Sequence, residues 1–156
     1  MELLKSVSHP NIITLEEMID CPEYLVLVLE LAEGGELFDQ MIKETVLEES
    51  LARTYFQQMV EAIVYLHSRK ICHRDLKPEN IVLCSSEEKN PVLKLTDLGL
   101  SKLVDQTILK TFCGTKFYMA PELWKNAGKG LVEVYTLKVD CWALVRYKST
   151  ALHRLF

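Results

Sequence analysis

Hydrophobic and polar positions follow two periodicities along the chain and predict a protein of mixed helices and strands. Residues 13–20 and 24–30, separated by Cys21-Pro22, have the composition and length of two strands. The second run is so apolar that we expect it to be buried on both faces. From Glu48 to Ser68 the apolar residues recur at helical spacing, which predicts the longest helix. Its core-facing residues are expected to be Leu51, Tyr55, Met59, Ile63 and Leu66.

Shorter patterns complete the expected order of elements. Residues 1–8 have the pattern of a helix that stops at His9-Pro10, because the residue before a proline is pushed out of the α region. A short helix is expected after Gly34-Gly35. Residues 81–83 and 92–97 predict two strands of a hairpin, joined by a polar turn. The loop before the first strand and the loop after the second therefore meet at one end of the hairpin.

That end of the predicted hairpin carries an unusual set of charges. Asn80 and Asp97 offer oxygen ligands of the kind that Mg²⁺ prefers. Asp75 is then free to accept a hydroxyl proton, and Lys77 can lie against a transferring phosphate. Phosphoryl transfer needs these parts, since it depends on positioning and charge neutralisation. A salt-bridged surface loop is the alternative for any one of these charges taken alone.

Composition narrows the class of protein. With 156 residues, 49% of them hydrophobic and 26% charged, the chain has the content of one globular domain. A formal net charge of -4 argues against a nucleic-acid or anionic-membrane partner. No segment has the pattern of a leader or a membrane span, so we expect a soluble intracellular protein of the nucleus or cytoplasm. The five cysteines are scattered, which predicts reduced and mostly buried thiols rather than a zinc site.

Three motifs together resemble those of the eukaryotic protein kinases. HRDLKPEN at 73–80 is similar to the catalytic loop, TDLG at 96–99 to the metal-binding segment, and APE at 120–122 to the end of the activation segment. The lysine of LKPEN is the serine/threonine form of the loop. VLELAEGGELFD and TFCGTKFYMAPE resemble the calmodulin-dependent-kinase-like group, and within it the checkpoint kinase 2 type.

The resemblance implies an α+β protein-kinase-like fold that is truncated at both ends. It places the end of the N-lobe and the hinge in residues 1–32, with the last two strands of that lobe. Residues 33–144 would form the N-terminal part of a mostly helical C-lobe, in which Asp140 braces the catalytic loop. Residues 145–156 would form a tail that resembles no kinase. A frameshift, an alternative exon or a faulty gene model would each leave such a tail, and the sequence leaves the choice open.

The resemblance also implies ATP and Mg²⁺ as cofactors and gives each site residue a role. Asp75 would be the catalytic base, Lys77 would contact the γ-phosphate, and Asn80 and Asp97 would bind magnesium. The residues expected around adenine are the hinge positions Glu30 and Ala32, the gatekeeper Leu29, and the apolar floor formed by Leu37 and Val82.

Protein substrates and regulation are implied in the same way. Glu36 and Glu79 match acidic positions that receive an arginine three residues before the target, which implies substrates with basic motifs. Thr115 would hydrogen-bond Asp75 and Lys77. A phosphate on Thr111, added by an upstream kinase or by self-phosphorylation, would pair with Arg74 and Lys102.

Two hypotheses remain open at this point. The chain contains no G-x-G-x-x-G and no V-A-I-K strand ahead of the expected hinge. The first hypothesis is a segment of a serine/threonine protein kinase with checkpoint-kinase-like signalling, whose chemistry belongs to a longer chain. The second is a naturally truncated, non-catalytic isoform that acts as a binding or decoy module. Under either hypothesis we expect the 156 residues alone to lack kinase activity and to be poorly soluble.

Overall fold

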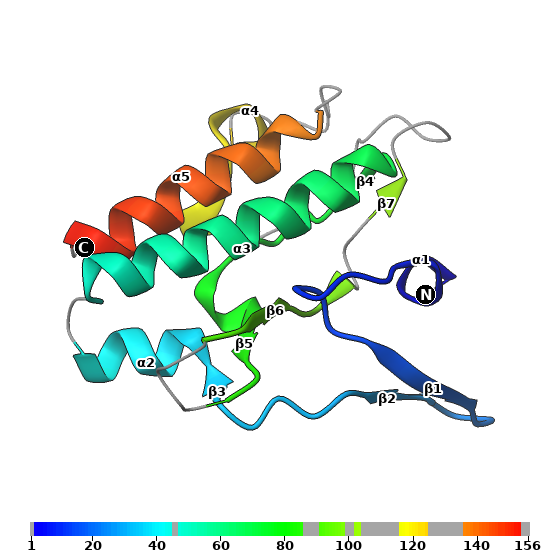
Figure 1. Ribbon diagram of the computed structural model, residues 1–156. Coiled ribbons are helices and arrows are strands. Elements are labelled where there is room, and N and C mark those ends of the chain that lie inside the picture. The colour runs from blue at the N-terminus through cyan, green and yellow to red at the C-terminus, as the bar shows by residue number, and fades with distance from the viewer. Residues whose placement is uncertain are drawn as a thin grey trace.

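The fold combines a helical layer with small antiparallel sheets, as the computed structural model shows for residues 2–44, 47–85, 91–98, 102–103, 116–124 and 136–153. Helices α3 and α5 lie side by side, and the β5–β6 hairpin packs beneath α3 (Figure 1). The described elements in chain order are α1 (Glu2–Ser6), β1 (Leu15–Asp20), β2 (Leu25–Leu29), β3 (Gly35–Glu36), α2 (Leu37–Glu44), α3 (Glu49–Ser68), β4 (Ile71–Cys72), a 3₁₀ helix (Pro78–Asn80), β5 (Ile81–Leu83), β6 (Leu93–Leu95), β7 (Lys102–Leu103), a second 3₁₀ helix (Lys116–Tyr118), α4 (Pro121–Trp124) and α5 (Lys138–His153).

The long helix α3 begins where its sequence provides a cap. The side chain of Glu48 accepts hydrogen bonds from the backbone N–H groups of Ser50 at 2.9 Å and Leu51 at 3.2 Å, which satisfies two donors of the first turn. The predicted core face is confirmed except at Leu51, which is only half-buried. The buried residues of this helix are Ala52, Tyr55, Met59, Ala62, Ile63 and Leu66.

The β1–β2 hairpin extends away from α2, α3 and α5 (Figure 1). Its antiparallel register runs from Leu15 opposite Leu29 to Asp20 opposite Leu25. The prediction that the second strand is buried on both faces is wrong, because its five residues are 36 to 39% exposed. Among the described strands β2 pairs with β1 alone, and a two-stranded sheet with no layer packed on it leaves both faces in contact with water.

The main core lies between α3 and the β5–β6 hairpin. Ile81, Leu93 and Leu95 of the hairpin have no exposed surface, and they pack with the buried face of α3 and with α5. The confirmed hairpin has the register Ile81 opposite Leu95, and Thr96 directly follows it. A second cluster under α4 consists of Cys72, Met119, Ala120, Leu123 and Val139. The charged loop before β5 therefore lies between two packed clusters.

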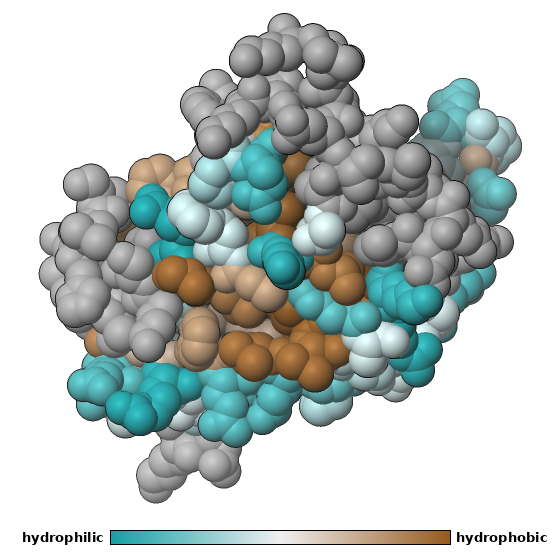
Figure 2. Space-filling view, turned by 90° about the horizontal axis from the view of Figure 1, so that it is seen from above, coloured by the Kyte–Doolittle hydropathy of each residue, from teal (hydrophilic) through white to brown (hydrophobic). Residues whose placement is uncertain are grey.

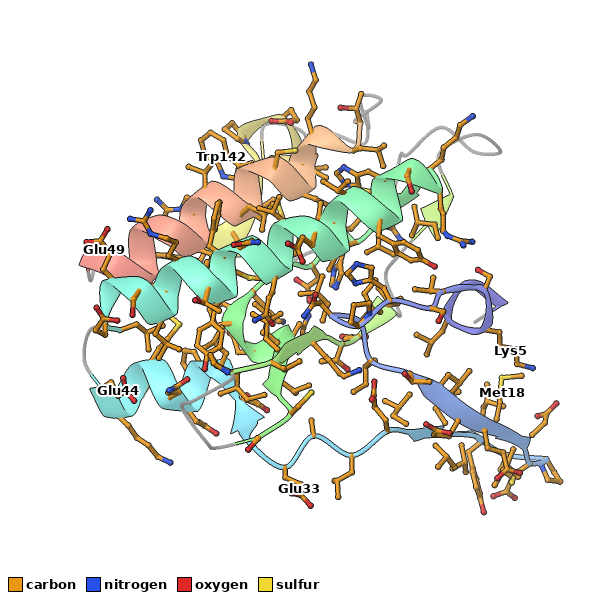
Figure 3. All side chains as sticks on the ribbon, viewed as in Figure 1. Lys5, Met18, Glu33, Glu44, Glu49 and Trp142 are labelled. Atoms are coloured by element: carbon orange, nitrogen blue, oxygen red, sulfur yellow. The ribbon has the colours of Figure 1, made fainter. Side chains whose placement is uncertain are left out.

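The outer face of the helical layer is partly apolar. Figure 2 shows hydrophobic residues across the middle of this face, with a row of hydrophilic residues along one edge. Trp142 on α5, labelled in Figure 3, is 42% exposed, and Val145 one turn later is 65% exposed. The prediction of mostly buried thiols is wrong for the described cysteines: Cys72 is buried, Cys21 and Cys84 are half-buried, and Cys141 is exposed.

Candidate active site

The loop between β4 and β5 brings three of the predicted site residues into direct contact. The Asp75 carboxylate is 7% exposed, and its Oδ2 lies 3.1 Å from Nζ of Lys77. The side-chain amide of Asn80 donates to the same Oδ2 at 3.0 Å and to the backbone oxygen of Asp75 at 2.9 Å. Because the amide nitrogen of Asn80 holds Asp75, its amide oxygen is the atom that remains for a metal ion.

Hydrogen bonds tie this loop to the segment that carries Asp97. The backbone N–H of Thr96 donates to the carbonyl of Asn80 at 2.9 Å. The ring of His73 has no exposed surface, and its Nε2 lies 3.2 Å from the Thr96 carbonyl. Asp97 follows with φ of 56°, in the left-handed region that non-glycine residues rarely occupy. The structure thus confirms that both loops meet at one end of the hairpin, and strained backbone of this kind is typical of functional sites.

The protonation of His73 follows from its surroundings. Burial lowers the pKa of its imidazole, although Asp140 and the Thr96 carbonyl act in the opposite direction. The backbone N–H of Asp75 donates to Nδ1 of this ring at 3.4 Å, so Nδ1 is an acceptor. The neutral tautomer with the proton on Nε2 then donates to Thr96, and we infer that His73 orients the loop without carrying charge.

Asp140 of α5 braces the same loop through hydrogen bonds to its backbone. It is 1% exposed, and its Oδ2 accepts from the backbone N–H of His73 at 2.9 Å while its Oδ1 accepts from that of Arg74 at 2.9 Å. Nε2 of His67, in the last turn of α3, lies 2.8 Å from Oδ2. Burial by itself would raise the pKa of Asp140, but the hydrogen bonds from His67 and the two backbone groups outweigh it and the pKa is lowered. Arg74 is held at φ of 73°, another left-handed residue.

The expected hinge lies between β2 and β3. The Glu30 side chain is anchored by Nζ of Lys94 at 2.7 Å and by the backbone N–H of Thr14 at 2.6 Å. Burial would raise the pKa of Glu30, but these hydrogen bonds lower it below its ordinary value. Leu29 is 38% exposed at the end of β2, and Ala32 is half-buried.

One residue of the expected adenine floor does not lie in the predicted place. Val82 is half-buried in the middle of β5, between Glu36 on β3 and Lys94 on β6. Leu37 has no exposed surface and belongs to the main core. A side chain that is fully enclosed by core residues has no surface for a ligand, so the assignment of Leu37 to the floor is wrong and Val82 alone remains.

The predicted substrate and regulatory residues are described only in part. Glu36 is exposed on β3, and β3 contacts the 3₁₀ helix that carries Glu79. Oε2 of Glu79 is buried and has no hydrogen-bond partner. Arg74 is half-buried beside the predicted base. Thr111 and Thr115 lie outside the described residues, and of Lys102 only the backbone is described, where it pairs with Cys72.

Sequence reasoning missed two residues that the fold brings to the site. Lys94 lies in the predicted strand 92–97, and the only local sign of its role is that a lysine stands between the core leucines Leu93 and Leu95. His67 lies in the last turn of α3, where a cation is favoured, but nothing local points to Asp140 far along the chain.

The donor set fits a magnesium ion held by few protein ligands. The amide oxygen of Asn80 and the carboxylate of Asp97 are hard oxygen donors at the same end of the hairpin, and Mg²⁺ commonly keeps water and phosphate oxygens as its other ligands. Within the described ranges no group of three or more His, Cys, Asp or Glu side chains is placed to hold a metal. No helix in the same ranges is both long and apolar enough to cross a membrane.

Comparisons with known proteins agree with this geometry. A family model described as "Protein kinase domain" matches residues 1–148. The chain is 41% identical over 144 residues to the ovarian-specific serine/threonine-protein kinase Lok of Drosophila melanogaster, covering 92% of this chain and 29% of that protein. It is 45% identical over 148 residues to the serine/threonine-protein kinase chk-2 of Caenorhabditis elegans, covering 92% and 30%.

A third relative extends the comparison to the group that the motifs resemble. The chain is 43% identical over 143 residues to the calcium/calmodulin-dependent protein kinase type IV of Mus musculus, covering 91% of this chain and 29% of that protein. The chain thus spans less than a third of the length of each of these three relatives. The family match confirms the resemblance drawn from the motifs and the α+β kinase-like fold. The chain belongs to the protein kinase family.

Proposed function

We propose that the chain is the part of a serine/threonine protein kinase that carries out phosphoryl transfer from ATP to a protein hydroxyl. The observation that supports this most directly is the contact of Asp75 with Lys77 and Asn80, at the end of the hairpin where Asp97 also lies. All four polar groups come from two loops held by the buried Asp140 and by the β5–β6 ladder. Every relative described above is named as a protein kinase, in agreement with this proposal.

The reaction assigns one task to each residue. The substrate hydroxyl oxygen attacks the γ-phosphorus, the bond from that phosphorus to the bridging oxygen breaks, and ADP leaves. The carboxylate of Asp75 accepts the hydroxyl proton, while Lys77 lies against the phosphoryl group in transfer. Asn80 and Asp97 would hold magnesium, which supplies charge neutralisation on the phosphates when it is bound. Backbone groups of Glu30 and Ala32 would position adenine above Val82, with Leu29 as gatekeeper.

Asp75 changes its contacts during such a reaction. In the structure its Oδ2 is shared by Lys77 and Asn80, so this carboxylate is oriented before any substrate arrives. A transferring phosphate would compete with Asp75 for the lysine. Release of Lys77 toward the phosphate would remove one contact of Oδ2, while the hydrogen bond from Asn80 still orients the carboxylate that accepts the proton.

Substrate choice follows from the two acidic residues beside the loop. The buried, unpaired Oε2 of Glu79 is a costly arrangement for a carboxylate, and a guanidinium of the substrate would satisfy it. Glu36 is exposed on the adjacent strand and would share the same guanidinium. We infer a preference for arginine three residues before the target Ser or Thr. Charge-assisted hydrogen bonds contribute about 1.5 to 3 kcal/mol each.

We also propose how the kinase is regulated and in which cellular setting it acts. A phosphate on Thr111 would pair with Arg74, whose backbone is already fixed by Asp140, and with Lys102 on β7. Either an upstream kinase or a second copy of the same kinase would add it. Thr115 would hydrogen-bond the base and the lysine during transfer. We infer checkpoint-kinase-like signalling in the nucleus or cytoplasm as the setting.

The test places residues 1–148 in the matching region of the Caenorhabditis elegans chk-2 protein and measures magnesium-dependent phosphorylation of a basic peptide. Asp75→Asn removes the proton acceptor while leaving the hinge and metal ligands, so we expect kcat to fall at least about a hundredfold with nucleotide binding unchanged. Asp20→Asn, at an exposed position of β1, is the matched control. Activity of Asp75→Asn within tenfold of the parent would refute the assignment.

A non-catalytic binding role is the second candidate. The six glycines of the chain form no G-x-G-x-x-G, so the 156 residues contain no loop of that kind to hold a triphosphate. We expect the chain alone to transfer no phosphate, since misplaced phosphates reduce the rate by orders of magnitude. Capture of a basic substrate peptide by the chain without phosphorylation favours this role. Magnesium-dependent phosphorylation by the chain alone, abolished by Asp97→Ala, would exclude it.

A further inference from the structure

One ion pair outside the catalytic loop connects the expected hinge directly to the strand that leads to Asp97. Nζ of Lys94 lies 2.7 Å from Oε1 of Glu30, and the two side chains are only 13% and 25% exposed. Lys94 is opposite Val82 in the β5–β6 ladder, and Asp97 is three residues further along the chain. The pair therefore joins the adenine end of the proposed site to its metal end.

The ion pair closes a ring of hydrogen bonds around the hinge. Glu30 donates its backbone N–H to Thr14 at 3.0 Å, and its carboxylate accepts from the N–H of Thr14 at 2.6 Å. The neighbouring residue Ile13 donates to Leu95 at 2.8 Å, and Leu95 is adjacent to Lys94. The ring runs from Glu30 through residues 13 and 14 to β6 and back through Lys94. Each of its links fixes hinge backbone relative to the hairpin.

We propose that the Glu30–Lys94 pair positions the hinge for adenine, as a device separate from the catalytic residues. This inference rests on the proposed function only in naming adenine as the ligand. The hinge contacts adenine through backbone groups, whose direction depends on where the Glu30 peptide lies. Because the Glu30 side chain turns to Lys94 and Thr14, it takes no part in the chemistry and acts through the backbone that it anchors. Lys94 is likewise a positioning residue.

The pair lies where packing contributes little to the position of the chain. The hairpin that precedes the hinge is exposed on both faces, so packing restrains this part of the chain weakly. The exposed ion pair between Arg53 and Glu49 on α3 offers a direct contrast, with side chains 77% and 72% exposed. Water screens exposed ion pairs, so they contribute little to stability. A largely enclosed carboxylate that binds two donors forms a stronger interaction.

The first experiment measures the hinge itself in the 156-residue chain. Amide hydrogen exchange at residue 30, whose N–H donates to the Thr14 carbonyl, is compared between the parent, Lys94→Met and Glu30→Gln. Lys94→Met keeps most of the apolar stem, so the loss of the charge is the main change. We expect exchange at the hinge to become about five- to tenfold faster, with α3 unchanged. Arg53→Met, which breaks the exposed pair, is the matched control and should change neither region.

The second experiment separates positioning from general stability. In the same chk-2 chimera, Lys94→Met should raise the KM for ATP about three- to tenfold with kcat within about twofold. The charge exchange Glu30→Lys with Lys94→Glu should recover at least half of the affinity. Hinge exchange and KM equal to the parent, or faster exchange spread equally over α3, would overturn the proposal. A chimera that transfers no phosphate would refute the proposed function instead, and hinge exchange would still decide on the ion pair.

Discussion

Asp140 holds the catalytic loop from a distant helix, and its replacement gives the sharpest prediction about the fold of the site. Asp140→Ala removes the acceptor of two buried backbone N–H groups, those of His73 and Arg74, and of the His67 ring. Water has little access to the contact between Asp140 and the loop, because His73 is 0% and Asp140 1% exposed. Arg74, with φ of 73°, then loses the bond that holds its left-handed backbone.

The expected magnitude follows from these contacts. Each buried donor left without a partner costs about 1 to 3 kcal/mol, and Asp140→Ala removes the acceptor of two backbone donors. We therefore expect Asp140→Ala to lower the free energy of unfolding by about 2 to 6 kcal/mol. Asp140→Asn keeps one acceptor oxygen but presents an N–H₂ group to a backbone donor, so its loss should be about 1 to 3 kcal/mol.

The lowered pKa of Asp140 determines how its contribution to folding stability changes with pH. The pKa of Asp140 is lowered in the folded chain, so the stability it contributes is fully present above the ordinary carboxyl range near pH 4. It is lost as the pH falls through the lower folded value. The difference in stability between the parent and Asp140→Asn should thus be constant near neutrality and shrink in acid.

Urea unfolding at micromolar concentration measures this prediction, with fluorescence of Trp142 as the probe because that residue lies two positions after Asp140 in α5. Amide exchange at His73 and Arg74 reports on the loop itself. Asp20→Asn, on the exposed strand β1, is the control. If Asp140→Ala unfolds within about 0.5 kcal/mol of the parent and both amides stay protected, the bracing role is wrong.

Three further predictions concern separate parts of the molecule. Leu27→Lys places a charge at the centre of the exposed strand β2 and should raise the soluble fraction of the chain severalfold in centrifugation assays, whereas unchanged sedimentation would show that this edge does not drive association. Glu79→Gln should reduce the preference for arginine over alanine three residues before the target by about tenfold on a peptide array, and an unaltered preference would assign that recognition to Glu36 alone. Tyr65→Phe removes the hydroxyl that accepts from the backbone N–H of Ser8 at 2.9 Å and should cost about 0.5 to 1.5 kcal/mol in urea unfolding, with a neutral result showing that the ring contacts with His9 and Arg69 suffice.

The sequence by itself determined the elements whose cause is local. Helix α3 and its buried face follow from the spacing of apolar residues, whereas α1 ends at Ser6, earlier than the stop at His9-Pro10 that the sequence predicts. The β5–β6 hairpin follows from two short apolar runs around a polar turn. Because the turn reverses the chain, the same local pattern predicts that Asn80 and Asp97 lie at one end. The predicted contact of the loops therefore needed no knowledge of the rest of the fold.

The tertiary structure alone decided which distant atoms meet at that site. Strands β4 and β7 have two residues each, too few for any periodicity, and only their pairing defines them. The family resemblance implies that Asp140 braces the loop, but only the fold shows which atoms it contacts across more than sixty positions, and the bond from Lys94 to Glu30 spans a similar separation. The tertiary structure also decided which apolar residues are buried. Leu37 is enclosed by the core, while the equally apolar β2 remains exposed. Hydrophobicity states what a side chain favours, but the layers that the fold provides determine what covers it.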